Sequence, residues 1–162
     1  MTLTEKKEAK PQPYRFYLAK EDAQKVRRWW QAMNEPKTKL KESHLVPAPS
    51  GQRARLSRAE SATSALFTDG FQALWQSFGS EGPLSKTQEP SAWASVCAVL
   101  SHVRINSPFN MAQQAGKVSE NGQPVVSQLR FRQLQSVNTE DELIRRLRRT
   151  LQQVNRSVSV EA

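Results

Sequence analysis

The residues of this sequence best suited to chemistry are arginines, which occur in two pairs near the C-terminal end. They lie in DELIRRLRRTLQQVNR, residues 141–156. In an α-helix the apolar side chains of this stretch fall within an arc of about 100°, and the arginines share the opposite side. The apolar side comprises Leu143, Ile144, Leu147, Leu151 and Val154, and the basic side comprises Arg145, Arg146, Arg148, Arg149 and Arg156. The stretch therefore predicts an amphipathic helix with one cationic face.

A solvated helix face is the simplest interpretation of these arginines, but the acidic residues that usually accompany one are missing. No acid occurs between Glu142 and Glu161, so the arginines are left to repel one another. A polyanion would relieve this repulsion, and the planar guanidinium group suits phosphate oxygens. The pattern favours contact with a phosphate backbone over readout of base edges.

Two further arginine clusters fall on other predicted helices. One comprises Arg53, Arg55 and Arg58, and the other comprises Arg130 and Arg132, which flank Phe131. If these clusters converge with the first on one surface, they form an extended basic patch. Phe131 is open to two interpretations, core packing or base stacking. The four tryptophans lie on apolar stripes and are predicted core residues: Trp29, Trp30, Trp75 and Trp93.

Composition agrees with a polyanionic partner. The 162 residues include 24 Lys plus Arg against 15 Asp plus Glu, a formal net charge of +9. Nucleic acid is the commonest such partner, and an anionic membrane surface is the rival. The sequence has neither an apolar run of spanning length nor a secretory signal, which predicts a cytoplasmic protein outside the membrane. A single cysteine, Cys97, excludes an internal disulfide and a multi-cysteine zinc site.

The periodicity of apolar residues predicts an all-α fold, a compact bundle of about five to seven helices without strands. Residues 1–13 are expected to form a mobile leader, residues 14–162 one helical domain, and residues 34–50 an exposed loop. The first helix is predicted from about Leu18, with Val26, Trp29, Trp30 and Met33 on its apolar side. Further helices are predicted over 51–67, 71–78, 90–104 and 127–135, with a short one near 109–115. The last helix is predicted to begin at a capping box formed by Thr139 and Glu142. The stripe of the 90–104 helix comprises Trp93, Val96, Cys97, Leu100 and Val103.

The sequence offers little for catalysis. His44 lies in the proline-rich stretch and His102 in a predicted core helix, and no carboxylate lies at a suggestive spacing from either. Cys97 is predicted to be a small buried hydrophobe. Phosphate-binding glycine loops and metal-ligand spacings are missing from the sequence. A protein without enzymatic activity, cofactor or metal is expected.

Four short motifs occur in a characteristic order: GQRARLSRA at 51–59, FQALW at 71–75, SQLRFRQL at 127–134 and ELIRRLRRTL at 142–151. From about residue 24 to 158 the chain resembles the small subunit of Cascade, the type I-E CRISPR surveillance complex, known as the CasB family. In that family the first motif usually ends in two arginines, and here Ser57 precedes Arg58. The family also continues into a final helix, which is expected to be missing after SVSVEA.

The resemblance implies an all-helical subunit, present in two copies, that assembles with the other Cascade subunits. It also implies contact with the backbone of guide RNA and target DNA, and retention of the displaced strand, which stabilises the R-loop. By position, the resemblance assigns nucleic-acid contacts to Arg53, Arg58, Arg130, Arg132, Arg148 and Arg149, and charge patterning adds Arg55 and Arg145. Two alternatives stay open: a free-standing basic helical RNA-binding protein, and a helical adaptor that binds an acidic protein.

Overall fold

The computed structural model describes residues 18–162, so the predicted leader at 1–13 lies outside the described residues. Within that range the chain forms nine helices and two very short strands, which confirms the all-α prediction. The helices are α1 (Lys20–Asn34), α2 (Lys37–Glu42), α3 (Gln52–Arg58), α4 (Ala62–Leu66), α5 (Asp69–Ser77), α6 (Pro90–Leu100), α7 (Met111–Gly116), α8 (Gln128–Gln135) and α9 (Glu140–Gln153), and the strands are β1 (Ile105–Asn106) and β2 (Ser157–Val158).

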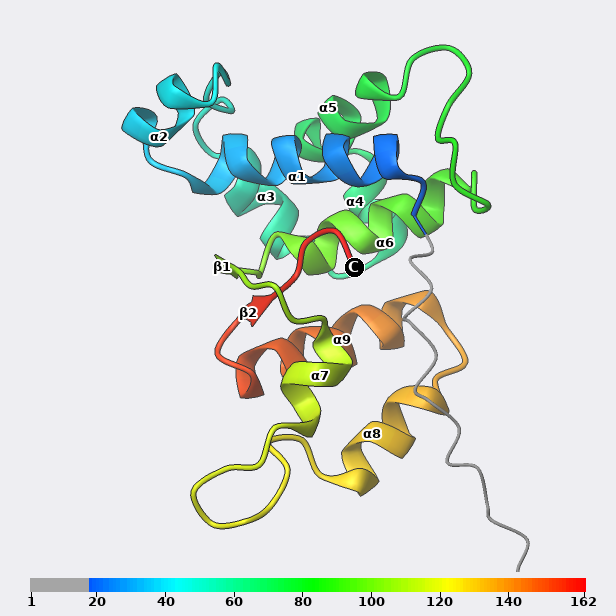
Figure 1. Ribbon diagram of the computed structural model, residues 1–162. Coiled ribbons are helices and arrows are strands. Elements are labelled where there is room, and N and C mark those ends of the chain that lie inside the picture. The colour runs from blue at the N-terminus through cyan, green and yellow to red at the C-terminus, as the bar shows by residue number, and fades with distance from the viewer. Residues whose placement is uncertain (1–17) are drawn as a thin grey trace, which may run out of the picture.

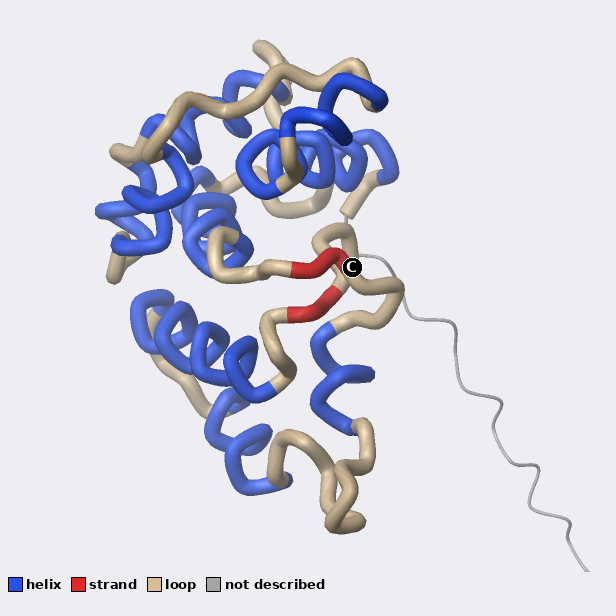
Figure 2. The backbone as a smooth tube through the Cα atoms, turned by 90° about the vertical axis from the view of Figure 1, so that its left-hand side faces the viewer, coloured by secondary structure: helices blue, strands red, loops and turns tan. Residues whose placement is uncertain are grey.

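The helices lie in two tiers (Figure 1). Helices α1 to α6 form the upper tier, in which α4 packs on α6 and α5 packs on α1 and α3. Helix α9 packs against α6 from below and also contacts α7 and α8. The view from the side shows the two short strands between these tiers (Figure 2). Helix α6 therefore provides the main contact between the upper tier and α9, and α4 adds a smaller one.

The predicted tryptophan core is confirmed. Trp29, Trp30 and Trp93 are buried, and Trp75 is partly buried against the same cluster. The indole Nε1 of Trp29 donates a hydrogen bond to the carbonyl of Gly70 at 2.7 Å, which satisfies the polar atom that burial removes from water. These side chains are therefore unavailable for base stacking.

A buried carboxylate fixes the loop that leads to α6. The Asp22 side chain, on α1, is fully buried. It accepts hydrogen bonds from the backbone N–H of Leu84 (3.2 Å), the backbone N–H of Ser85 (2.7 Å) and the Ser85 hydroxyl. These bonds compensate the carboxylate for its lost hydration and hold the loop against α1.

Two predicted boundaries in the first half of the chain are wrong. The expected loop 34–50 contains α2, whose Leu40 is 2% exposed and packs inward. A helix of six residues is too short to show apolar periodicity, so only packing reveals it. The helix expected over 51–67 is two helices, because the Ser61 side chain accepts a hydrogen bond from the N–H of Ser64 and caps a new start at α4.

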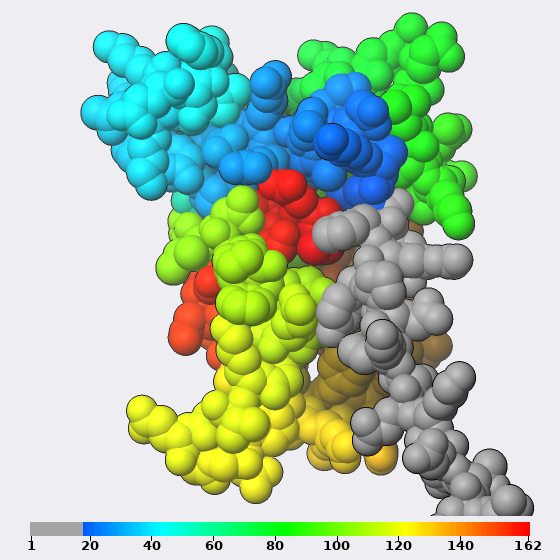
Figure 3. All heavy atoms as spheres, in the orientation of Figure 1, coloured from blue at the N-terminus to red at the C-terminus, as the bar shows by residue number. Residues whose placement is uncertain are grey.

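Two further expectations fail at α6 and the C-terminal segment. Helix α6 ends at Leu100, and Val96, assigned to its core stripe, is 41% exposed. Strands were not expected, yet Ile105 pairs in parallel with Ser157, and Asn106 with Val158. Pairs of two residues are too short for the alternation by which a sequence predicts strands. In Figure 3 the C-terminal segment fills the space between α1 and the region of α7.

Candidate nucleic-acid interface

Helix α9 has the amphipathic character predicted for it. The Thr139 hydroxyl caps its first turn by accepting a hydrogen bond from the N–H of Glu142 at 3.2 Å. Ile144, Leu151 and Val154 are buried, while Leu143 and Leu147 on the same side are partly exposed. Helix propensity and packing on α6 therefore fix the direction in which each arginine of α9 points.

Arg148 departs from the predicted cationic face. Its guanidinium group donates to the carbonyl of Ala98 from Nη2 (3.0 Å) and Nε (3.3 Å), and from Nη2 to the carbonyl of Leu56 (3.4 Å). These carbonyls lie in the last turns of α6 and α3, where the helix dipole favours a cation. Burial is the main cause that lowers the pKa of Arg148. The arginine thus ties three helices together and is not directed at an external phosphate.

The cluster on α3 is also largely committed within the chain. Arg53 Nε donates to the carbonyl of Ser101 at 3.2 Å, just beyond the end of α6. Arg55 forms an ion pair with Asp69 at 2.7 Å on the surface. Arg58 is exposed and lacks an acidic partner among the described residues. Of the three predicted contacts on α3, only Arg58 is free.

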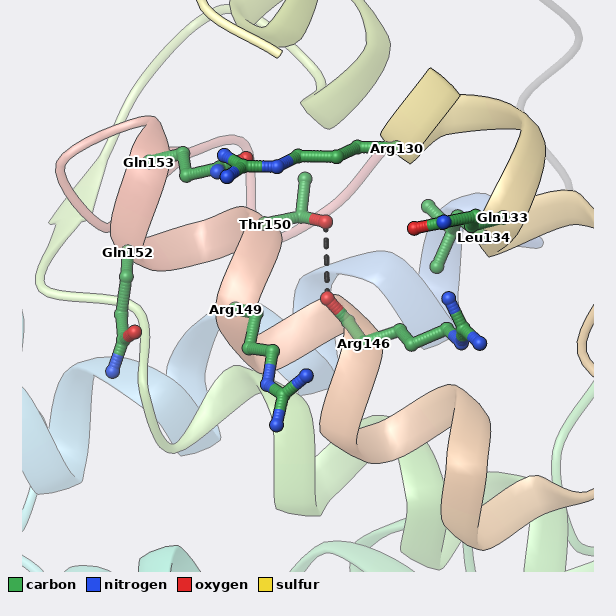
Figure 4. A pocket seen from close by; sticks show the side chains of 8 residues that line it. All are labelled: Arg130, Gln133, Leu134, Arg146, Arg149, Thr150, Gln152 and Gln153. Carbon is green, nitrogen blue, oxygen red and sulfur yellow. Dashed lines mark hydrogen bonds between the residues drawn. The ribbon is translucent and has the colours of Figure 1, made fainter. Parts of the chain in front are cut away.

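Two of the predicted arginines, Arg130 and Arg149, line a groove at a different place, between α8 and α9. This α8–α9 groove has a volume of about 510 Å³ and is lined by Arg130, Gln133, Leu134, Arg146, Arg149, Thr150, Gln152 and Gln153. In Figure 4, Arg130 extends from α8 over the groove toward Gln153, and Arg146 and Gln133 project from facing helices. Two sequence clusters thus converge, and the cluster on α3 lies in the upper tier, away from α8 (Figure 1).

Charge in the groove is unbalanced. Arg146 is neutralised by Glu142, one turn earlier on α9, with Nη2 to Oε1 at 2.6 Å, and this hydrogen bond is the main cause that lowers the pKa of Glu142. Arg130 and Arg149 are exposed and have no acidic partner within residues 18–162. The groove therefore presents two free guanidinium groups to a polyanion.

Sequence reasoning missed the amide side chains of the groove. Gln133, Gln152 and Gln153 line it beside the arginines, and each provides N–H donors suited to phosphate or sugar oxygens. Glutamine occurs at many positions of this sequence, so only the facing of α8 and α9 identifies these three. The groove is thus rich in donors and contains no aromatic side chain.

The remaining predicted residues of α8 and α9 lie outside the groove. Arg132 and Arg145 are exposed and do not line it. Phe131 is 40% exposed, so it belongs neither to the core nor to the groove. Core packing is therefore excluded for Phe131, and base stacking by this exposed ring stays a prediction.

Cys97 and His102, which were considered for catalysis, are held within the fold. Cys97 is fully buried, and burial raises the pKa of its thiol. Burial also lowers the pKa of His102, whose Nε2–H donates to the carbonyl of Ser57 at 3.0 Å. Within residues 18–162, His, Cys, Asp and Glu side chains form no cluster able to hold a metal ion. In the same range, every helix is too short or too polar to cross a membrane.

Comparison with known protein families identifies the chain. The model of one family, described as CRISPR-associated protein Cse2, matches residues 52–161. Comparisons with curated proteins and with solved structures gave no significant match. The matched segment is more than half of the 162 residues and contains every arginine cluster discussed above. The chain therefore belongs to the CRISPR-associated Cse2 family, the small subunit of the type I-E Cascade complex.

Proposed function

We propose that this Cascade subunit binds the phosphate backbone of nucleic acid in the α8–α9 groove and thereby stabilises the R-loop. The observation that supports this function is the presence of two free guanidinium groups, those of Arg130 and Arg149, in the lining of one donor-rich groove. Guanidinium groups without an acidic partner remain available for charge-assisted hydrogen bonds to the phosphates of a bound polyanion.

The composition of the groove favours backbone contact over base recognition. Arginine and glutamine donors suit phosphate and sugar oxygens, which carry no sequence information. Without an aromatic side chain, the groove has no platform on which bases could stack. A subunit that assists every guide sequence requires this lack of base preference.

Modest contacts are sufficient for such a role. Exchange of a DNA duplex for an RNA–DNA hybrid is nearly balanced in free energy, so contacts to the backbone decide how long the R-loop persists. A few charge-assisted hydrogen bonds of about 1.5–3 kcal/mol each would prolong it considerably. No covalent chemistry is needed, in agreement with a structural rather than catalytic subunit.

The wider proposal follows the architecture of the family. Two copies of the chain lie in the cytoplasmic complex beside the guide RNA and target DNA, and they hold the displaced strand. Arg58, Arg132 and Arg145 are exposed outside the groove and are further candidates for contact with the backbone.

Reconstitution tests this function. The other Cascade subunits and a guide RNA are assembled with and without the chain, and R-loop lifetime is measured on a matched DNA target. We expect the chain to co-purify with the complex and its omission to shorten the lifetime. An equal lifetime with and without a stably incorporated chain would contradict the proposal.

A further inference from the structure

Helix α8 is attached to the rest of the molecule less firmly than the other long helices. Not one of its eight residues is buried. Leu129 is 66% exposed and Phe131 40% exposed, so the apolar side chains of α8 contribute little to the core. An isolated helix of this length is marginal in water, because helical stability in proteins comes mostly from packing.

Polar contacts do not compensate for the missing packing. Within residues 18–162, no hydrogen bond or ion pair between side chains joins α8 to α9, its main neighbour. Leu134 is the apolar residue of α8 that lines the α8–α9 groove, and it is only partly buried. Arg130 and Arg149, which line the same groove, carry like charge and therefore add no attraction between the two helices.

The segments on either side of α8 are better fixed. Val126, two residues before the helix, is 6% exposed, and its N–H donates to the carbonyl of Ala115 at 3.0 Å. After α8, the side chain of Thr139 caps the first turn of α9 and fixes the chain there. Helix α8 is thus a segment of low local stability between two fixed points, the arrangement from which ligand-responsive elements are drawn.

We propose that a phosphate backbone bound in the α8–α9 groove stabilises α8 against α9 by bridging Arg130 and Arg149. This inference rests on the function proposed above and adds a structural response to it. In the free protein α8 opens more readily than α9, and the bound backbone supplies the missing contacts between the two helices. Ligand binding and docking of α8 are then thermodynamically coupled.

Hydrogen exchange of the intact chain, followed by mass spectrometry, tests the coupling. In the free protein, amides of residues 128–135 are expected to exchange faster than those of 143–151. A saturating short RNA–DNA hybrid should slow exchange at 128–135 about tenfold, since a single charge-assisted hydrogen bond gives an effect of this size. Saturation is established independently by fluorescence anisotropy of the labelled hybrid.

Arg130→Gln removes the contribution of α8 to the bridge, and it should abolish the slowing at 128–135 at saturating hybrid. Arg28→Gln is the matched control, because it removes the same charge from an exposed position of α1 that lies outside the groove lining. It should preserve the slowing. Both positions are exposed, and circular dichroism verifies that each variant retains its helical content.

The outcomes separate this inference from the function on which it depends. Binding of the hybrid without slower exchange at 128–135 overturns the coupling and leaves the proposed function intact. Equal slowing in Arg130→Gln and wild type also overturns it. Failure of the hybrid to bind overturns both phosphate binding in the groove and the coupling. Equal protection of residues 128–135 by an acidic polypeptide such as polyglutamate overturns the assignment of phosphate as the bridging group.

Discussion

Replacing Arg148 with Met should destabilise the fold while leaving nucleic-acid binding largely unchanged. The substitution keeps an unbranched aliphatic stem but removes the guanidinium donors to the carbonyls of Ala98 and Leu56. Hydrogen bonds from a charged donor contribute about 1.5–3 kcal/mol each. The group is half-buried and its bond to Leu56 is long, so we expect a loss of about 2 kcal/mol in the free energy of unfolding rather than a sum over all contacts. For a chain of this size that loss lowers the melting temperature by about 4–8 °C.

Arg149→Met is the matched control, because the neighbouring residue has the same chemistry but lies exposed in the groove. It should leave the free energy of unfolding within about 0.5 kcal/mol of wild type. It should also reduce the slope of log affinity against log salt by about 0.9 on duplex DNA, the amount lost with one phosphate contact.

Thermal unfolding and anisotropy titrations at several salt concentrations measure both properties for both variants. We expect Arg148→Met to lower the free energy of unfolding without changing the slope of log affinity against log salt. We expect Arg149→Met to reduce that slope without changing the free energy of unfolding. The opposite result refutes this reasoning: Arg148→Met has the melting temperature of wild type and a reduced slope of log affinity against log salt. Arg148 would then contact phosphate, as the sequence pattern predicted.

Three further predictions concern the core. Asp22→Ala removes the acceptor of three hydrogen bonds and should lower the free energy of unfolding, measured in urea titrations, by about 3 kcal/mol. Asp22→Asn keeps one acceptor oxygen and should lower it by less. Equal stability of Asp22→Ala and wild type would contradict the role assigned to Asp22. Burial lowers the pKa of His102 below its ordinary 6.5, so the unfolded chain binds a proton that the folded chain does not, and stability should fall as pH drops through about 6.5. Melting temperatures across this pH range should fall less steeply in His102→Gln, and identical slopes would exclude His102 as the cause. Cys97 is fully buried with its thiol pKa raised, so a thiol reagent should label it only after unfolding, and stoichiometric labelling of the native protein would be inconsistent with this burial.

Helical periodicity was sufficient to predict the elements that bury one clear stripe. The apolar face of α9 and the tryptophans of the core follow from spacing, and the start of α6 follows from a proline suited to the first helical turn. The errors fall where an element is too short to be periodic, as in α2 and the paired strands, or where a single residue restarts a helix, as Ser61 does before α4.

For the candidate site, prediction from the sequence is limited by tertiary packing. A sequence pattern can place Arg148 and Arg149 on one helix, but it does not show that Arg148 reaches the ends of α3 and α6. Likewise, the grouping of Arg130 with Arg149 depends on how α8 lies against α9. Tertiary packing therefore decides which arginines stabilise the fold and which remain free to bind phosphate.

The most direct test of the central claim is R-loop lifetime in reconstituted Cascade that contains the Arg130→Glu/Arg149→Glu subunit. A second complex, with Arg28→Glu/Arg104→Glu, carries the same change in charge at exposed positions that do not line the groove. If the groove holds the backbone, both variants assemble and only the groove variant shortens the lifetime toward that of the complex without the subunit. Equal lifetimes for the two assembled variants would contradict the assignment of backbone binding to the α8–α9 groove.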